Sequence, residues 1–228
     1  MAEKRVIESY GIVIPVWNEG KVIYSVLSEL KRLVPSTIVV FDDGSTDNTY
    51  TEAKKARVIV IRHVLNRGKG AAIKTGIEKC KALGLDVVVT FDGDGQHDPH
   101  DVLRMLTQLS DGYDVVLGSR FLTPQSIPLM KKIWNRMANY MTYILFGVWV
   151  TDSQSGFRAY RKTAFMIFDT KSDRYEFDTE VIRDIRHHSL RYKEIPIHVR
   201  YTPYSQTKET KQNFSSGMQT VLNILIRE

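Results

Sequence analysis

Short apolar runs and amphipathic segments alternate along the first 120 residues. Runs rich in β-branched residues predict five buried strands, over residues 10–16, 37–41, 58–61, 86–91 and 113–117. Apolar residues at helical spacing predict helices between them, with Asn18 and Asp47 capping the first two and Asp98-Pro99 starting the fourth. Strands that alternate with helices indicate an α/β fold with a doubly wound, Rossmann-like, mostly parallel sheet flanked by helices.

The pattern changes after residue 120, where two segments carry a wide apolar stripe. Residues 129–146 predict a helix with a broad apolar face and three basic residues. Residues 213–227 repeat this character, with apolar residues at i, i+4, i+7, i+8 and i+11. Two interpretations stay open, because such stripes either pack in a core or dimer interface or lie as amphipathic helices on a membrane surface.

The composition is that of an ordinary globular protein. The 228 residues are 43% hydrophobic and 25% charged, which excludes a disordered or fibrous chain and suits a single domain over residues 1–228. The single cysteine, Cys80, excludes an intrachain disulfide. No signal peptide is predicted, and the most lipid-like stretch, residues 141–150, has half of the about 20 residues that a membrane span needs.

Positive charge is concentrated in the second half of the chain. Residues 1–119 carry 15 Lys and Arg against 16 Asp and Glu, whereas residues 120–228 carry 17 against 10. A basic half is either a solvated surface or a site for an anionic partner, namely phosphate groups, a membrane surface or nucleic acid. Charge alone does not choose among these.

The strongest chemical signal is the segment FDGDGQHD at residues 91–98. Asp92 and Asp94 follow a predicted strand two residues apart, so both carboxylates can face one cation. Oxygen ligands suit Mg²⁺ and Mn²⁺, which often bridge to phosphates. The ordinary alternative is a solvated turn in which Asp98 caps the next helix, and His97 is expected to be a loop histidine rather than a ligand.

Two further polar clusters follow predicted strands. The segment DDGSTD at residues 42–47 offers a carboxylate to a nucleobase N–H or to ribose hydroxyls, although an Asx turn explains such a cluster equally well. The segment NRGKG at residues 66–70 places two glycines and two cations at a helix N-terminus, which suits phosphate. Ligands of such sheets bind outside the carboxyl ends of the strands, so Asp42, Asp92 and Arg120 are expected to gather along one edge.

Taken in order, these segments resemble the inverting family-two glycosyltransferases of the GT-A fold. The resemblance rests on residues 13–19 (VIPVWNE), 42–45 (DDGS), 66–70 (NRGKG), 92–96 (DGDGQ) and 118–120 (GSR). The dolichol-phosphate mannose and glucose synthase branch is resembled by residues 152–158 (DSQSGFR), 175–177 (YEF) and Pro196-Ile197 followed by Arg200 and Lys208.

The resemblance implies a metal-dependent enzyme that transfers one sugar, with inversion, to a polyprenyl (dolichyl) phosphate. The implied donor is GDP-mannose, UDP-glucose or UDP-N-acetylglucosamine. Residues 1–120 would form the nucleotide-sugar and metal half, and residues 121–228 the acceptor half. The implied protein is peripheral on the cytoplasmic face of a membrane, as a homodimer or beside a membrane subunit, and does not bind nucleic acid.

The resemblance also implies roles for individual residues. The nucleotide-sugar would be bound by Pro15, Trp17, Glu19, Asp42, Asp43 and Lys69, with Arg200 and Lys208 neutralising its phosphates. The divalent metal, Mg²⁺ or Mn²⁺, would be held by Asp92, Asp94 and Gln96. The acceptor would meet Arg120, Arg136, Ser155 and Arg158, with a structural ion pair as the alternative role of Arg158.

One departure from the wider family concerns the general base. Many inverting GT-A enzymes carry a Glu-Asp pair whose Asp deprotonates a hydroxyl acceptor, whereas this chain reads Asp152-Ser153-Gln154. A phosphate monoester has a second pKa near about 6, so it is largely dianionic at neutral pH and attacks without a base. The alternative is a sugar-hydroxyl acceptor, with Asp152 as the base. Nucleotidyl transfer also uses paired acids, but residues 13–19 lack the glycine-rich basic loop that it favours.

Overall fold

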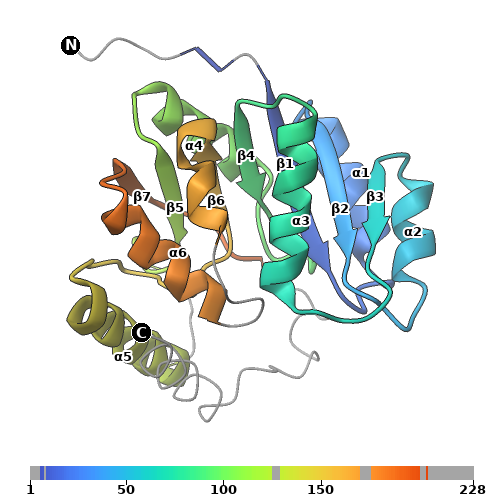
Figure 1. Ribbon diagram of the computed structural model, residues 1–228. Helices are drawn as coiled ribbons and strands as arrows, with labels where there is room; N and C mark the ends of the chain where they lie inside the picture. Colours follow the sequence, from blue (N-terminus) through green and yellow to red (C-terminus); the bar gives the residue numbers. More distant parts are fainter. Residues whose placement is uncertain (1–5, 8, 125–128, 170–175, 201–203, 205–228) are drawn as a thin grey trace.

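The computed structural model describes residues 6–7, 9–124, 129–169, 176–200 and 204. Figure 1 shows a single sheet with helices on both faces. Its strands are β1 (Tyr10–Val16), β2 (Thr37–Asp42), β3 (Ile59–Arg62), β4 (Val87–Thr90), β5 (Val115–Ser119), β6 (Arg158–Arg161) and β7 (Tyr192–Pro196). The helices are α1 (Ile23–Leu33), α2 (Thr49–Lys55), α3 (Lys69–Ala82), α4 (His100–Ser110), α5 (Leu129–Phe146) and α6 (Glu176–His187), with a 3₁₀ helix, η1 (Lys162–Phe168).

The sheet is mostly parallel, as predicted, and strands from both halves of the chain enter it. The order of its seven strands is β3-β2-β1-β4-β6-β5-β7. Only β6 runs antiparallel to its neighbours, between β4 and β5. The five predicted strands lie within two residues of the observed ones. The strand β6 was not predicted, because its sequence RAYR has two arginines and no apolar run, yet all four of these residues are buried.

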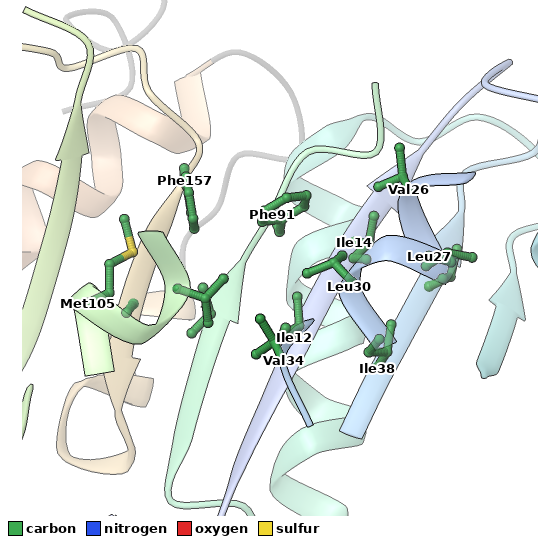
Figure 2. Close-up of a cluster of buried hydrophobic side chains, with 14 of the residues drawn as sticks. Ile12, Ile14, Val26, Leu27, Leu30, Val34, Ile38, Phe91, Met105 and Phe157 are labelled. Carbon is green, nitrogen blue, oxygen red and sulfur yellow. The ribbon is translucent and has the colours of Figure 1, made fainter. Parts of the chain in front are cut away.

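Each face of the sheet has its own core, because successive strand residues point to opposite faces. From β1, Ile12 and Ile14 pack with α1 and α4 in the cluster that Figure 2 shows. Val13 points to the other face, where it packs with α3, η1 and α6. Gly76 lets α3 approach this closely, since a Cβ there would lie 2.4 Å from Val13 Cγ1. Helices on both faces make the sheet doubly wound, as the alternating pattern indicated.

The loop after β1 differs from its prediction. Asn18 does not cap α1, which begins at Ile23. Asn18 has a φ of 54°, and its Oδ1 accepts a hydrogen bond from the Thr46 N–H at 2.9 Å. Its side chain therefore joins the loops after β1 and β2, a contact 28 residues away in sequence that helical spacing does not reveal. Asp47 does accept the N–H of Thr49, in the first turn of α2, at 2.9 Å.

The helix α5 spans the predicted residues, but its polar face is the buried one. Met130, Met137 and Ile144 are exposed by 50–68%, whereas Asn135 and Asn139 are each exposed by only 4%. These side chains therefore do not pack in the core, and a dimer interface or a membrane surface stays open for this stripe. Because helix periodicity only separates the two faces, it does not say which one turns inward. The second stripe, residues 213–227, lies outside the described residues.

Within the described parts of the chain, none of the helices combines the length and the apolar character that a membrane span requires.

Candidate active site

The loops that carry the candidate site residues meet at one edge of the sheet, as expected. The carboxyl ends of the parallel strands β2, β4 and β5 lead into Asp42, Asp92 and Arg120. Because β6 is antiparallel, its beginning lies at the same edge, where Arg158 pairs with both Thr90 of β4 and Leu117 of β5. The topology thus brings residues 152–158 of the second half beside the acidic loop of the first half.

Asp92 is held between a lysine and a histidine. Its Oδ1 lies 2.7 Å from Lys69 Nζ, and its Oδ2 lies 3.1 Å from His97 Nε2. Burial opposes ionisation, but the Lys69 ammonium and the His97 contact outweigh it and hold the pKa of Asp92 well below its usual range. Asp92 is therefore a carboxylate at neutral pH.

Asp94 lies in a different electrostatic setting. Its two oxygens accept hydrogen bonds from the backbone N–H and the side-chain amide of Gln96, both at 3.0 Å. Burial, followed by the negative charge of Asp92, raises the pKa of Asp94. A divalent cation between the two carboxylates would relieve this unfavourable charge, and their oxygens are the ligands that Mg²⁺ and Mn²⁺ prefer. The residues present therefore fit such an ion.

The described residues contain no group of three or more acidic, histidine or cysteine side chains arranged for a metal. Two carboxylates are an incomplete ligand set for Mg²⁺ or Mn²⁺, which commonly complete their coordination with water and substrate phosphates. The observed pair is consistent with an ion that is shared with a diphosphate.

His97 lies in the loop between β4 and α4, as predicted, and has a structural role there. It is buried, and its ring lies against Phe91 and Phe157, with centroids 5.4 and 4.7 Å away. Since its Nε2 contacts Asp92, it fixes the orientation of that carboxylate. Nothing in the sequence pattern marked this role, because Phe157 comes to His97 only through the pairing of β4 with β6.

Lys69 is the first residue of α3 and reaches the same site. The N–H groups of Arg67 and Gly68, just before it, donate to Asp43 at 3.0 and 2.7 Å. Gly68 has a φ of 111°, a conformation that favours glycine, so the loop turns sharply into α3. This turn directs Lys69 to Asp92 and sets it beside Gly156, where a Cβ would lie 2.2 Å from Lys69 Nζ.

Gly156→Ala is expected to push the Lys69 ammonium away from Asp92 with little loss of stability, because the tip of a flexible side chain is what must move. A charge-assisted contact contributes about 1.5–3 kcal/mol, so kcat/KM should fall about 10-fold or more. Steady-state kinetics and the Tm would be measured for Gly156→Ala, Lys69→Met and the double variant. Additive losses in the double variant would show that Gly156 acts by another route.

Asp42 and Asp43 have different partners within the chain. The Asp43 carboxylate accepts three hydrogen bonds from the chain itself, from Arg67 N, Gly68 N and His63 Nδ1, and its contact with the nucleotide-sugar stays a prediction. Asp42 is fully buried, and its Oδ1 accepts the Ser45 N–H at 2.9 Å. Its Oδ2 lies 3.2 Å from Arg62 Nε but is without a hydrogen bond in the described part of the chain. That oxygen keeps its predicted role toward a nucleoside.

Pro15, Trp17 and Glu19 lie at the end of β1, beside the loop of Asp42. Pro15 and Trp17 are half-buried, and Glu19 is buried. The Glu19 side chain accepts a hydrogen bond from the Tyr204 hydroxyl at 3.0 Å. No sequence pattern indicates Tyr204, because it lies 185 residues from Glu19 and belongs to no periodic segment.

Arg120 and Asp152 form a bidentate pair. Arg120 Nε and Nη2 donate to Asp152 Oδ2 and Oδ1 at 2.7 and 2.8 Å, and the Arg120 backbone N–H adds a third bond at 3.0 Å. The Asp152 side chain is 0% exposed, whereas that of Arg120 is 32% exposed. The Arg120 guanidinium can therefore meet a ligand, while both Asp152 oxygens face Arg120. This arrangement disfavours Asp152 as a general base.

Arg158 holds the loop before β6 together. Its side chain is 2% exposed and donates to the carbonyls of Ser155, Ser153 and Asp178 at 2.8, 2.8 and 3.1 Å. This geometry favours the structural alternative for Arg158, and its contact with the acceptor stays a prediction. Ser155 is buried as well, and its Oγ has no hydrogen-bond partner in the described part of the chain.

The three other predicted cations have separate positions. Arg200 pairs with both oxygens of Glu29 at 2.8 and 3.0 Å and with Asp98 at 3.1 Å, and its role in neutralising phosphate stays a prediction. The backbone N–H of Arg200 donates to Gln96 O at 2.8 Å, which connects the segment after β7 to the loop of Asp92 and Asp94. Arg136 is exposed on α5. Lys208 lies outside the described residues.

Fold and site together define a class of enzyme. A doubly wound, mostly parallel sheet flanked by helices is the architecture of GT-A glycosyltransferases. The chain belongs to glycosyl transferase family 2, whose model matches residues 11–167. The protein is a glycosyltransferase.

Two curated relatives cover nearly the whole chain. An uncharacterized protein of Methanocaldococcus jannaschii is 42% identical over 223 residues, which are 95% of this chain and 91% of the relative. The UDP-N-acetylglucosamine–dolichyl-phosphate N-acetylglucosaminyltransferase of Methanococcus voltae is 36% identical over 238 aligned positions, 94% of each chain.

Among solved structures, glucosyl-3-phosphoglycerate synthase of Mycobacterium tuberculosis, in complex with Mn²⁺, UDP and phosphoglyceric acid, has the same fold. Its TM-score is 0.70, the sequences are 19% identical, and the match covers 96% of this chain and 78% of the synthase. At this identity the likeness shows the fold alone.

Proposed function

We propose that this protein transfers one sugar from a nucleotide-sugar to a polyprenyl phosphate, with inversion at the anomeric carbon. The observation that carries the proposal is the pair of Arg120 and Asp152 on the acceptor side of the site. It offers a partly exposed guanidinium to an anion, while the carboxylate that could have served as a base is buried against it. The Methanococcus voltae relative, by its name, acts on dolichyl phosphate, which supports this acceptor class.

A phosphate acceptor fits this geometry because it carries its own negative charge. At neutral pH a phosphate monoester is largely dianionic, so one of its oxygens attacks the anomeric carbon and no side chain has to remove a proton. The chain's task is then to hold two anions near each other. Arg120 contacts the acceptor phosphate, and Lys69, at the N-terminus of α3, lies on the donor side beside Asp92.

On the donor side, Asp92 and Asp94 would hold Mg²⁺ or Mn²⁺, with Gln96 orienting Asp94. The bound ion would supply charge neutralisation for the departing nucleoside diphosphate. Pro15, Trp17 and Asp42 line the nucleoside position. We propose UDP-N-acetylglucosamine as the first donor to test, on the likeness to the Methanococcus voltae enzyme, with GDP-mannose and UDP-glucose beside it.

The test is a matrix of donors and acceptors. Each of the three nucleotide-sugars would be incubated with a short polyprenyl phosphate or with the matching polyprenol, in Mg²⁺, Mn²⁺ or EDTA. We expect one donor to be used, with the phosphate as the only acceptor and no product in EDTA. Transfer to the polyprenol or to a free sugar hydroxyl, at a rate equal to that with the phosphate, would overturn the proposal.

The outer face of α5 supports a second part of the proposal, that the protein docks on a membrane surface. Met130, Met137 and Ile144 repeat every seven residues along this exposed face. Beyond the helix end, the Trp149 ring contacts those of Tyr140 and Tyr143, with centroids 5.5 and 5.8 Å away. Apolar and aromatic residues beside basic ones are typical of helices that lie in a lipid interface.

Docking is expected to be measurable with vesicles. The protein should sediment with phosphatidylcholine vesicles that contain phosphatidylglycerol, and less so at high salt, because charges are screened beyond about 8–10 Å at physiological ionic strength. The double variant Met137→Glu/Ile144→Glu should stay in the supernatant. Leu103→Glu, which adds the same charge to an exposed leucine of α4, is the control and should sediment like the wild type. Equal sedimentation of all three would count against docking through α5.

A further inference from the structure

The inner face of α5 is polar and buried, so its side chains need hydrogen-bond partners. Asn135, Asn139 and Thr142 follow one another at i, i+4 and i+7, and all three are at most 4% exposed. A buried amide is costly unless it is hydrogen-bonded, so the positions of these bonds carry information. The two asparagines bond the chain segment 151–153, which connects α5 to the loop before β6.

Asn139 holds both peptide groups that flank Asp152. Its Nδ2 donates to Thr151 O at 2.7 Å, and its Oδ1 accepts the Ser153 N–H at 3.0 Å. Asn135 does less, since its Nδ2 donates to the same Thr151 O at 2.8 Å while its Oδ1 has no hydrogen-bond partner in the described part of the chain. The two residues are of one type, equally buried and one helical turn apart, but only Asn139 spans Asp152.

The other side of the same segment is anchored in the sheet. The Thr151 hydroxyl bonds Ser119 Oγ at 2.6 Å and Glu194 Oε1 at 2.9 Å, and the Thr151 N–H donates to Glu194 at 2.8 Å. These partners lie in β5 and β7, so Asp152 is fixed between α5 and the sheet. The position of Asp152 then determines that of the Arg120 guanidinium, which donates a hydrogen bond to each of the two Asp152 oxygens.

We infer that Asn139 is a positioning residue that sets Arg120 for the acceptor phosphate through Asp152. The expected change in the acceptor KM rests on the proposed function. The positioning of Asp152 and Arg120 by Asn139 does not. The two faces of α5 then have connected roles. Its outer face is apolar and exposed, and its inner face forms hydrogen bonds with the segment that holds Asp152. The orientation of α5 is thereby coupled to the placement of Arg120.

The test compares Asn139→Leu with Asn135→Leu. Both variants replace an equally buried asparagine of the same helix by leucine. For Asn139→Leu we expect the KM for a short polyprenyl phosphate to rise about 10-fold, with an unchanged KM for the donor, because two hydrogen bonds beside Asp152 are lost. For Asn135→Leu the rise should stay below about 3-fold, since Asn139 still bonds Thr151 O. Equal rises in the acceptor KM of both variants would mean that the inner face only packs the helix, and would overturn the inference.

A second readout needs no substrate. In ¹⁵N-labelled protein, the Arg120 Nε–H signal reports the bond to Asp152, and we expect it to shift and exchange faster in Asn139→Leu but not in Asn135→Leu. An unchanged signal in folded Asn139→Leu overturns the inference. A shifted signal with an unchanged acceptor KM supports the positioning by Asn139 and overturns instead the proposed acceptor role of Arg120.

Folding is controlled by the Tm of each variant and by a second substitution. Asn139→Ala removes the same two hydrogen bonds without placing an apolar side chain against the Thr151 carbonyl, so its acceptor KM should rise as in Asn139→Leu. In an Arg120→Gln background, Asn139→Leu should raise the acceptor KM no further, because both changes act on one contact. Full additivity would show that Asn139 acts independently of Arg120.

Discussion

Asp94→Asn is expected to reduce sugar transfer about 10³-fold. The change keeps the size of the side chain but removes the carboxylate that, with Asp92, would hold the divalent ion. The charge stabilisation that a metal gives to a leaving diphosphate amounts to several kcal/mol, and each 1.36 kcal/mol corresponds to about a factor of ten in rate. The fold should persist, because Asp94 lies in a loop and bonds only Gln96 among the contacts described for its carboxylate.

The measurement is kcat/KM at saturating Mg²⁺ or Mn²⁺, together with Mn²⁺ binding followed by electron paramagnetic resonance. Asp111→Asn, at the end of α4, removes a carboxylate far from the carboxyl edge and serves as the control. The wild type in EDTA should resemble Asp94→Asn. Full activity of the wild type in EDTA, or of Asp94→Asn with bound Mn²⁺, would contradict the role assigned to this carboxylate.

Arg120→Gln is expected to lower kcat/KM for the polyprenyl phosphate about 10–150-fold, because a charge-assisted contact of about 1.5–3 kcal/mol is lost from an anion that must approach another anion. Asp152→Asn should lower kcat/KM less, since the Arg120 charge remains and only the contact that positions it is weakened. The order of the two effects carries the information. If Asp152 were a general base, its loss would cost about 10²–10⁴-fold and would exceed that of Arg120.

Both variants need a stability measurement, because Asp152 is fully buried in the pair. Removing one partner of a buried ion pair leaves the other charge without compensation. Urea denaturation of both proteins would show whether enough folded enzyme is present, and the kinetics would be normalised to it. An inactive but folded Asp152→Asn beside a mildly affected Arg120→Gln would replace the phosphate acceptor with a hydroxyl acceptor.

Local patterns were sufficient for β1 to β5, for the helices between them, for α5 and for the shared edge of the sheet. The apolar runs of β1, β2 and β4 are buried strands whatever lies beside them, because both faces of a doubly wound sheet are covered. Asp42, Asp92 and Arg120 follow strands, and parallel strands bring their carboxyl ends to one edge. Their meeting is therefore a consequence of chain direction, which the order of the elements already contains.

The partners of individual side chains were not predictable in this way. Arg158, Arg200 and Asp43 carry the charges expected of ligand-binding residues, yet each is satisfied within the protein, by carbonyls, carboxylates or backbone N–H groups. The residues that satisfy them are mostly distant in sequence. A charged residue in a motif thus identifies a loop that matters, while tertiary packing decides which groups of the chain its charge contacts.

By itself, the sequence determined the doubly wound class, the places of β1 to β5, the paired carboxylates after β4 and the amphipathic character of α5. These depend on period, spacing and residue type, which are local properties. Tertiary structure alone decided that β6 enters the sheet antiparallel, that His97 contacts Asp92, that Arg120 and Asp152 form one unit, and that α5 turns its asparagines inward. Each of these depends on which surfaces meet when distant segments pack, and a periodic pattern leaves that choice open.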